Sequence, residues 1–131
     1  MVIGFTGTQQ GMNYKQRNSV LMYLRSIKFD EVHHGDCIGA DQDFHHLVLR
    51  YFPEIRVIGH PPVIPAKRAF CIFSEERAPK PYLDRNRQIV AECDLLIACP
   101  KETTEQTRSG TWATVRYARQ AKKQVQVFPP S

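Results

Sequence analysis

The chain has 131 residues, of which 42% are hydrophobic, and its formal net charge is +5. This length suffices for one well-buried core and is too short for two typical domains, so we expect a single domain over residues 1–131. The basic balance suits an anionic partner, either a nucleotide or a nucleic acid. No run approaches about 18 apolar residues, and the first residues lack a secretory-signal pattern, so we expect a cytoplasmic protein without a membrane partner.

Neither a disulfide framework nor a metal centre is indicated by the cysteines and histidines. The four cysteines follow no Cys-x-x-Cys spacing, which favours reduced thiols: Cys37, Cys71, Cys93 and Cys99. A second group lies close together in the sequence but gives no four-ligand spacing: His33, His34, Cys37 and His45. The sequence therefore predicts no metal site and no bound cofactor.

The first half of the chain alternates strand-like and helix-like patterns. We expect strands at residues 2–6, 29–34 and 55–59, and helices at residues 14–27 and 41–51. The apolar residues of the first helix share one face at spacings of three and four: Val20, Leu21, Leu24 and Ile27. The second helix carries a similar stripe: Phe44, Leu47, Val48 and Tyr51.

Residues 60–81 interrupt this alternation. They contain five prolines and too little periodicity for a clear element, although residues 68–76 could form a helical turn. Long loops are often functional, and Lys67, Arg68 and Arg77 would make this one a basic lid. The alternative is a packed crossover that merely spans the sheet.

The second half of the chain resumes the alternation. Helices are expected at residues 82–93 and 111–121, and strands at residues 95–99 and 125–128. The strand at 95–99 is wholly apolar, as in a buried parallel sheet. Strands that alternate with helices form right-handed βαβ crossovers. The fold class is therefore α/β, a doubly wound, five-stranded parallel sheet with helices on both faces.

Small and polar residues follow the expected strands. Gly7-Thr8-Gln9 follows the first strand, Gly35-Asp36 the second, His60 the third and Pro100-Lys101 the fourth. The carboxyl ends of parallel strands share one edge, and ligands bind there at the point where the strand order reverses. We therefore expect these loops to converge on one crevice.

The segment Ser109-Gly110-Thr111 opens the last predicted helix. The unpaired N–H groups of a helix N-terminus and the positive end of its dipole favour an anion, and Gly110 lets that anion approach closely. An ordinary helix cap requires the same small, hydroxyl-bearing residues. The segment is thus a candidate phosphate loop whose alternative is a simple cap.

Four motifs taken together resemble the SLOG superfamily, and most of all the Rossmann-like core of the bacterial DNA-processing protein A (Smf) group. In chain order they are Gly4-Phe5-Thr6-Gly7-Thr8-Gln9, Gly35-Asp36-Cys37-Ile38-Gly39-Ala40-Asp41 with His45, Arg85-Asn86-Arg87-Gln88-Ile89-Val90, and Ser109-Gly110-Thr111-Trp112-Ala113-Thr114. The resemblance spans nearly the whole chain. It implies a Rossmann-like domain that binds a nucleotide or a nucleotide-derived ligand.

The resemblance also implies roles for individual residues. The residues that flank the phosphate or ribose would be Gly7, Thr8, Gln9, Ser109, Gly110 and Thr111, and Gly35 and Trp112 would also bind the ligand. Asp36 and Asp41 would accept hydrogen bonds from ribose hydroxyls, while Gly39 and Ala40 keep the turn small. Asp41 could instead cap the second helix, and His45 is expected to be a buried, hydrogen-bonded histidine.

Arg85 and Asn86 open the third predicted helix, on the other half of the same sheet edge. The rigid fork of an arginine matches a phosphate in a bidentate manner, and an asparagine can bind a base or ribose edge. The structural alternative is an Arg85 that pairs with Asp84 or Glu92. The resemblance favours the ligand-binding role.

The last helix suggests a different function. A basic, partly aromatic stripe lies along it at helical spacing: Trp112, Arg116, Arg119 and Lys123. Such a stripe could bind single-stranded nucleic acid, although a solvated helix face has the same pattern. Trp112 could also form the floor of the ligand pocket or fill a subunit interface, so a homo-oligomer is compatible with the sequence.

Hydrolysis of an N-glycosidic bond is a third hypothesis. The related phosphoribohydrolases that release cytokinin bases carry a glutamate three residues after the Gly-Thr pair, where this chain has Thr114. Glu105 could substitute for it, because a carboxylate near the anomeric carbon stabilises an oxocarbenium-like state. Nucleotide-ligand binding therefore leads, with N-glycosidic hydrolysis and single-stranded DNA binding as alternatives.

Overall fold

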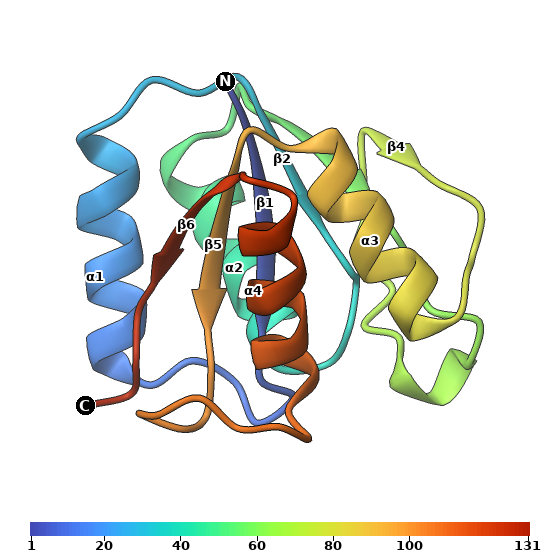
Figure 1. Ribbon diagram of the computed structural model, residues 1–131. Helices are drawn as coiled ribbons and strands as arrows, with labels where there is room; N and C mark the ends of the chain where they lie inside the picture. The colour runs from blue at the N-terminus through green and yellow to red at the C-terminus, as the bar shows by residue number, and fades with distance from the viewer.

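The computed structural model describes residues 1–131 and contains one parallel sheet of six strands in the order β4-β3-β2-β1-β5-β6 (Figure 1). The strands are β1 (Val2–Gly7), β2 (Glu31–His34), β3 (Arg56–Gly59), β4 (Glu75–Glu76), β5 (Leu95–Cys99) and β6 (Gln124–Val127). The helices are α1 (Tyr14–Arg25), α2 (Ala40–Tyr51), α3 (Tyr82–Glu92) and α4 (Gly110–Gln120), with a short 3₁₀ helix η1 (Pro65–Lys67).

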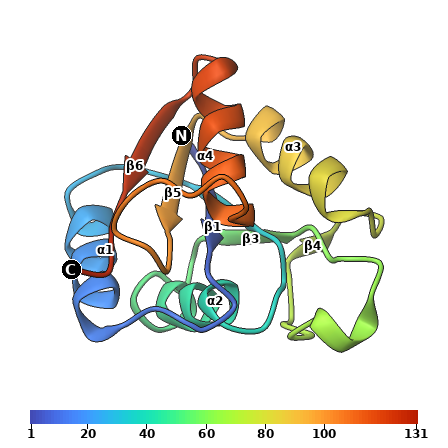
Figure 2. The same ribbon diagram turned by 60° about the horizontal axis from the view of Figure 1, so that its bottom comes forward.

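The helices cover both faces of the sheet, because successive residues of each strand point to opposite faces. Figure 2 shows α1 and α2 on one side and α3 and α4 on the other. On the first side, Phe5 of β1 stacks on Phe44 of α2 with ring centroids 4.2 Å apart. On the second side, a side chain at Gly4 would lie 2.9 Å from the sulfur of Cys93, so glycine lets α3 pack closely against β1.

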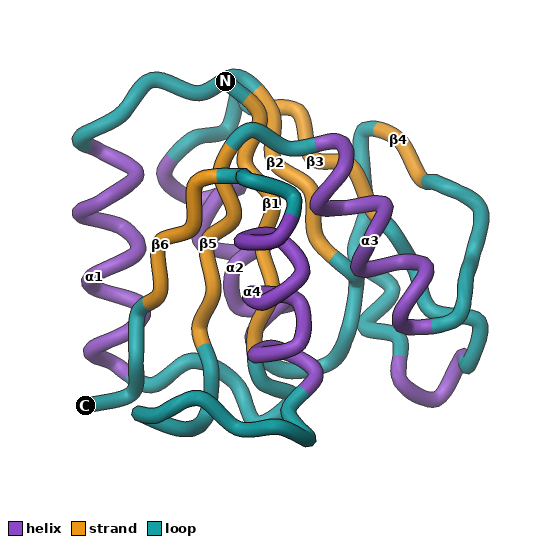
Figure 3. The backbone as a smooth tube through the Cα atoms, in the orientation of Figure 1, coloured by secondary structure: helices purple, strands orange, loops and turns teal.

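The α/β fold class and the parallel sheet are confirmed, but the prediction of five strands is wrong. The sixth strand, β4, is a two-residue edge strand that pairs with Ile58 and Gly59 of β3 (Figure 3). The pair Glu75–Glu76 is too short and too polar to give a strand pattern. The helical turn suggested at residues 68–76 is also wrong, because the only helical turn of this segment is η1.

The other predicted elements are present with small differences at their ends. The first helix ends at Arg25 rather than at residue 27, and α2 and α4 each begin one residue earlier than predicted. The order of the strands reverses between the neighbours β1 and β5, since the chain first adds strands on one side of β1 and then on the other. The loops that follow these two strands lie together at the bottom of Figure 1. No helix of the fold has both the length and the apolar character needed to span a membrane.

Candidate functional site

A cavity of about 460 Å³ opens at the carboxyl ends of β1 and β5, where the strand order reverses. Ten of the fourteen residues predicted for the site line it: Gly7, Thr8, Gln9, Gly35, Asp41, Arg85, Asn86, Ser109, Gly110 and Thr111. These residues come from the loops after β1, β2 and β5 and from the first turns of α2, α3 and α4. The expected convergence of the loops is therefore present.

Asp36 does not line the cavity, contrary to the predicted contact with a ribose. Its side chain is fully buried, and its carboxylate accepts hydrogen bonds from Nε of Arg68 at 2.5 Å and from the backbone N–H of Cys71 at 3.0 Å. The backbone of Asp36 is left-handed, with φ of 53°, which aspartate tolerates better than most residues. Asp36 therefore anchors the segment after η1 instead of facing a ligand.

Gly39 and Ala40 also lie outside the lining, and they shape it indirectly. Gly39 has φ of +103°, and a Cβ there would lie 2.3 Å from the carbonyl oxygen of Gln9. The methyl group of Ala40 lies 2.5 Å from the position that a Cβ on Gly7 would occupy. Both residues thus let the loop after β1 pack directly on the start of α2.

Trp112 is the fourth predicted residue that does not line the cavity. It is only 6% exposed and packs in the apolar cluster between the sheet and α3. Its indole nitrogen is buried without a hydrogen-bond partner. Trp112 is therefore a core residue, and neither a base nor another subunit can stack on it in this conformation.

The N-terminus of α4 faces the cavity. The Ser109 hydroxyl caps the helix by accepting a hydrogen bond from the N–H of Trp112 at 3.2 Å. The N–H groups of Gly110 and Thr111 precede the first hydrogen-bonded turn and lie beside the cavity, and a Cβ on Gly110 would meet no atom within 4 Å. Capping and anion binding are thus compatible here, since the cap uses a different N–H group.

Arg85 is 5% exposed and is fixed by the protein itself. Its Nη1 donates to the carbonyl oxygens of Gly35 at 2.6 Å and His60 at 3.2 Å, and its Nε donates to the side-chain oxygen of Asn86 at 2.7 Å. Only Nη2 lacks an oxygen acceptor, with the sulfur of Cys37 at 3.6 Å. Arg85 therefore joins the ends of β2 and β3 to α3 and has one nitrogen, Nη2, without an oxygen acceptor, so the predicted bidentate fork is mostly occupied.

The carboxylate of Asp41 lies in the buried wall of the cavity. Its Oδ2 accepts a hydrogen bond from the N–H of Cys37 at 3.1 Å, while α2 has no side-chain cap at Gly39. Burial raises the pKa of Asp41 to about 6, although the nearby Arg85 guanidinium acts in the opposite direction. Asp41 is thus a carboxylate that changes charge near neutral pH, a property common at functional sites.

Nine lining residues are not among the fourteen predicted site residues: Phe5, Thr6, Gln10, Cys37, Tyr82, Leu83, Ile89, Lys101 and Glu102. The hydroxyl of Tyr82 and Oε1 of Glu102 are buried and have no hydrogen-bond partner in the protein. Such orphaned polar atoms in a cavity wall are available to a ligand. Lys101 belongs to the loop after the fourth predicted strand, which was expected to converge on the crevice, and the same position directly after Pro100 is the signal for Glu102.

Glu105 lies away from the cavity, contrary to its suggested catalytic role. Its carboxylate accepts a hydrogen bond from Nη1 of Arg116 at 2.9 Å. The same guanidinium donates to the carbonyl oxygens of Gln106 and Thr107. Glu105 and Arg116 therefore hold the loop between β5 and α4 against the helix.

The predicted basic stripe on α4 is largely used within the fold. Trp112 is buried, Arg116 holds the preceding loop, and Nζ of Lys123 donates to the carbonyl oxygen of Cys93 at 2.9 Å. Only Arg119 of the stripe has no polar partner in the protein. These contacts disfavour a nucleic-acid track on this helix.

Two of the three basic residues of the predicted lid at residues 60–81 are likewise paired within the fold. Arg68 binds the carboxylates of Asp36 and Glu76, and Arg77 binds those of Glu75 and Glu92. Neither arginine lines the cavity. The alternative of a packed crossover therefore describes this segment better.

The remaining sequence predictions concern His45 and the cysteines. His45 is buried, with Nδ1 at 3.0 Å from Nε2 of His34, as a hydrogen-bonded core histidine should be. All four cysteines are free thiols. No family model matches the chain, and a search of the curated proteins finds no match.

Proposed function

We propose that this chain binds a nucleotide or a nucleotide-derived phosphate ligand in the cavity at the carboxyl edge of the sheet. The observation that carries the proposal is the polarity of the cavity wall. The open N-terminus of α4 lies on its lining, and a buried carboxylate, that of Asp41, lies there too. The volume of about 460 Å³ is within the range of small-molecule sites.

The phosphate would lie at the N-terminus of α4. The N–H groups of Gly110 and Thr111, together with the helix dipole, favour an anion, and Lys101 adds a positive charge on the same lining. The hydroxyl groups of Thr8 and Thr111 supply further donors. Glycine at position 110 leaves this approach open.

The sugar and base would lie along the rest of the wall. Asp41 offers an acceptor for ribose hydroxyls, and Tyr82 offers a hydroxyl group without a partner in the protein. Asn86 presents an amide on the same lining. This combination of acceptors and donors suits a polar heterocycle or a pentose better than an apolar molecule.

We also propose that the fold is Rossmann-like and doubly wound and that the chain belongs to the SLOG superfamily, near the DNA-processing protein A group. The reversal of the strand order between β1 and β5 supports the fold assignment. Each of the four resembling motifs begins or ends on the cavity lining: at Gln9, at Gly35 and Asp41, at Arg85, and at Ser109.

A thermal-shift screen tests the proposed function, because a ligand that binds the native state raises its melting temperature by mass action. The screen uses AMP, ADP, ADP-ribose and a cyclic dinucleotide, with inorganic phosphate and adenosine as the two halves of the ligand. We expect an intact nucleotide to stabilise the protein more than either half. Equal stabilisation by phosphate alone would contradict a nucleotide site.

Hydrolysis of an N-glycosidic bond remains a second candidate, because Oε1 of Glu102 is buried on the cavity lining without a partner. A carboxylate in that position could stabilise the oxocarbenium-like state of a bound nucleotide. We expect any release of free base from a nucleoside monophosphate to be lost in Glu102→Gln and kept in Glu105→Gln. Chromatography of the products checks this, and loss of release in Glu105→Gln alone would contradict the assignment.

A further inference from the structure

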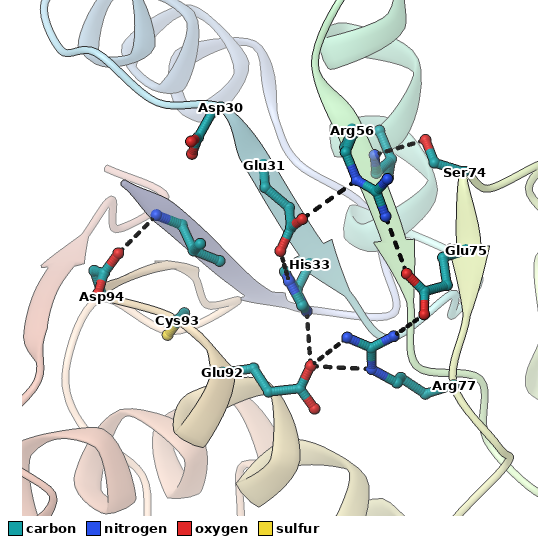
Figure 4. Close-up of polar contacts among 12 residues, drawn as sticks. Asp30, Glu31, His33, Arg56, Ser74, Glu75, Arg77, Glu92, Cys93 and Asp94 are labelled. Atoms are coloured by element: carbon teal, nitrogen blue, oxygen red, sulfur yellow. Dashed lines mark hydrogen bonds and ion pairs between the residues drawn. The ribbon is translucent and has the colours of Figure 1, made fainter.

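A cluster of two histidines and a glutamate lies outside the cavity, between the sheet and the end of α3. His33 of β2 and His60, directly after β3, are each 1% exposed, and Nδ1 of His33 lies 2.7 Å from Nε2 of His60. Oε1 of Glu92, the last residue of α3, is 3.8 Å from the same Nδ1 (Figure 4). The ligand atoms of the three residues all lie within 4.8 Å of one another.

The outer nitrogens of the two rings determine where their protons lie. Nε2 of His33 is 2.7 Å from a carboxylate oxygen of Glu31, which only accepts, so this nitrogen carries a proton. Nδ1 of His60 faces the amide oxygen of Gln88 at 3.3 Å and donates to it in the same way. In neutral rings the two inner nitrogens are then both unprotonated, and two lone pairs face each other across 2.7 Å. A proton on one of them, or a metal cation between them, removes this repulsion.

The charges around the cluster also favour a cation. Glu31, Glu75 and Glu92 supply three carboxylates, and Arg56 and Arg77 supply two guanidinium groups, in one connected network (Figure 4). With both histidines neutral, this network has one excess negative charge. Of the two carboxylate oxygens of Glu92, only Oε1 accepts hydrogen bonds from Arg77, which leaves Oε2 without a partner.

We propose that His33, His60 and Glu92 form a binding site for a divalent transition-metal ion of the zinc class. Two imidazole nitrogens and one carboxylate are a common zinc set that leaves a fourth position for water. Glu31 and Gln88 act as the outer hydrogen-bond acceptors that orient metal-binding histidines. Zinc–nitrogen bonds require the inner nitrogens to separate to about 3.3 Å, which a small tilt of the rings provides.

A second group of possible ligands, His34, His45 and Cys71, is arranged differently. Nδ1 of His34 accepts the N–H of Asp36 at 3.0 Å, so its proton is on Nε2 and is donated to Nδ1 of His45 at 3.0 Å. This chain of hydrogen bonds is complete with neutral rings and leaves no pair of opposed lone pairs. The metal is therefore assigned to the cluster of His33, His60 and Glu92 alone.

The site would have a structural role. It joins β2, the end of β3 and the end of α3, and the carbonyl oxygen of His60 also accepts the hydrogen bond from Arg85 in the cavity wall. Metal binding at His60 would therefore hold this wall in place. The inference is independent of the ligand that occupies the cavity.

The test uses the full chain, stripped with a chelator, incubated with zinc chloride and desalted. We expect elemental analysis to find about one zinc ion per chain and zinc to raise the melting temperature. Glu92→Gln, which removes a half-buried ligand, should lose the bound zinc, and Glu31→Gln should weaken binding about 10-fold or more. Cys71→Ser is the matched control and should bind zinc as the wild type does.

Cobalt(II) identifies the donor atoms. Bound cobalt should show the visible bands of a tetrahedral site without the near-ultraviolet sulfur-to-metal band of a thiolate ligand. Loss of metal in Cys71→Ser, or a thiolate band, would overturn the proposal. Absence of zinc from the folded wild type would do the same, and it would mean that a proton, not a metal ion, lies between the two rings in an ordinary hydrogen bond.

Discussion

At the scale of single residues, the charge of the buried Asp41 carboxyl group depends on pH. Its pKa is about 6 in the folded state, above the ordinary value of 3.8, because the side chain is buried. The folded state thus binds the proton more tightly, and its stability falls as the pH rises through the window from about 4 to 6. Above this window the ionised carboxylate costs about 3 kcal/mol.

Asp41→Asn should therefore raise the free energy of unfolding by about 3 kcal/mol at about pH 8 and by little at about pH 4. Urea denaturation at both pH values measures the difference. Asp84→Asn, which removes an exposed carboxylate of α3, is the control for the loss of one charge and should show no such dependence. An Asp41→Asn protein that is no more stable than the wild type at high pH would refute the buried-carboxylate account.

Gly39, which lies outside the cavity lining, and Gly110, which lies on it, differ in what surrounds them. Gly39→Ala combines a φ of +103° with a Cβ placed 2.3 Å from a backbone oxygen, and should lower the free energy of unfolding by about 2–4 kcal/mol. Gly110→Ala adds a methyl group to open space at the start of a helix, and should change stability by less than about 1 kcal/mol. Thermal or urea denaturation of the pair checks this. Equal losses would contradict the geometry of the loop after β1.

At the scale of elements, the segment between β3 and α3 depends on Asp36. The carboxylate of Asp36 binds Arg68 and the N–H of Cys71, and its carbonyl oxygen accepts the N–H of Ala69 at 2.8 Å. Asp36→Asn keeps a residue type that tolerates the left-handed backbone but removes the buried charge opposite Arg68. The segment should then open more readily.

Hydrogen exchange of residues 68–77 measures this opening. We expect protection in this segment to fall in Asp36→Asn while α1 keeps its protection. Glu76→Gln alters the exposed partner of the same arginine and is expected to change little, since exposed ion pairs contribute about 0–1 kcal/mol. Unchanged exchange in Asp36→Asn would show that the segment is held by other contacts.

The elements that could be predicted from sequence are those with a repeating apolar pattern. The helices from Tyr14 and Tyr82 begin where predicted, and β5 has the predicted bounds, because burial of one face or of a whole strand imposes a period on the sequence. The edge strand β4 has no such pattern, since its two glutamates are exposed.

The site was predictable only as far as topology determines it. Parallel strands bring their carboxyl ends to one edge, which placed Gly7, Asp41, Arg85 and Ser109 on the cavity lining. Whether a side chain there faces the cavity or a distant segment depends on contacts that periodicity does not encode. Asp36 turns to Arg68, which is 32 residues away in sequence, and Trp112 turns into the core.

At the scale of the whole molecule, the reversal of the strand order between β1 and β5 determines where the proposed ligand cavity lies. β1 and β5 are far apart in the sequence but are neighbours in the sheet. The loops that follow them form the cavity together with the first turns of α3 and α4. The cluster of His33, His60 and Glu92 lies beside this cavity and shares His60 with the contact to Arg85. Separate variants test the two proposals, Gly110→Asp for binding in the cavity and Glu92→Gln for metal binding.

The central claim is that the phosphate of a nucleotide binds at the N-terminus of α4. Calorimetric titration of the nucleotide that stabilises the protein most in the screen tests it, with the wild type, Gly110→Asp and Gln120→Asp compared. We predict one site per chain, abolished by Gly110→Asp, because a carboxylate would occupy the position that favours an anion. Gln120→Asp adds the same charge at the far end of the same helix and should bind as the wild type does. Wild-type affinity in a folded Gly110→Asp protein would contradict the claim.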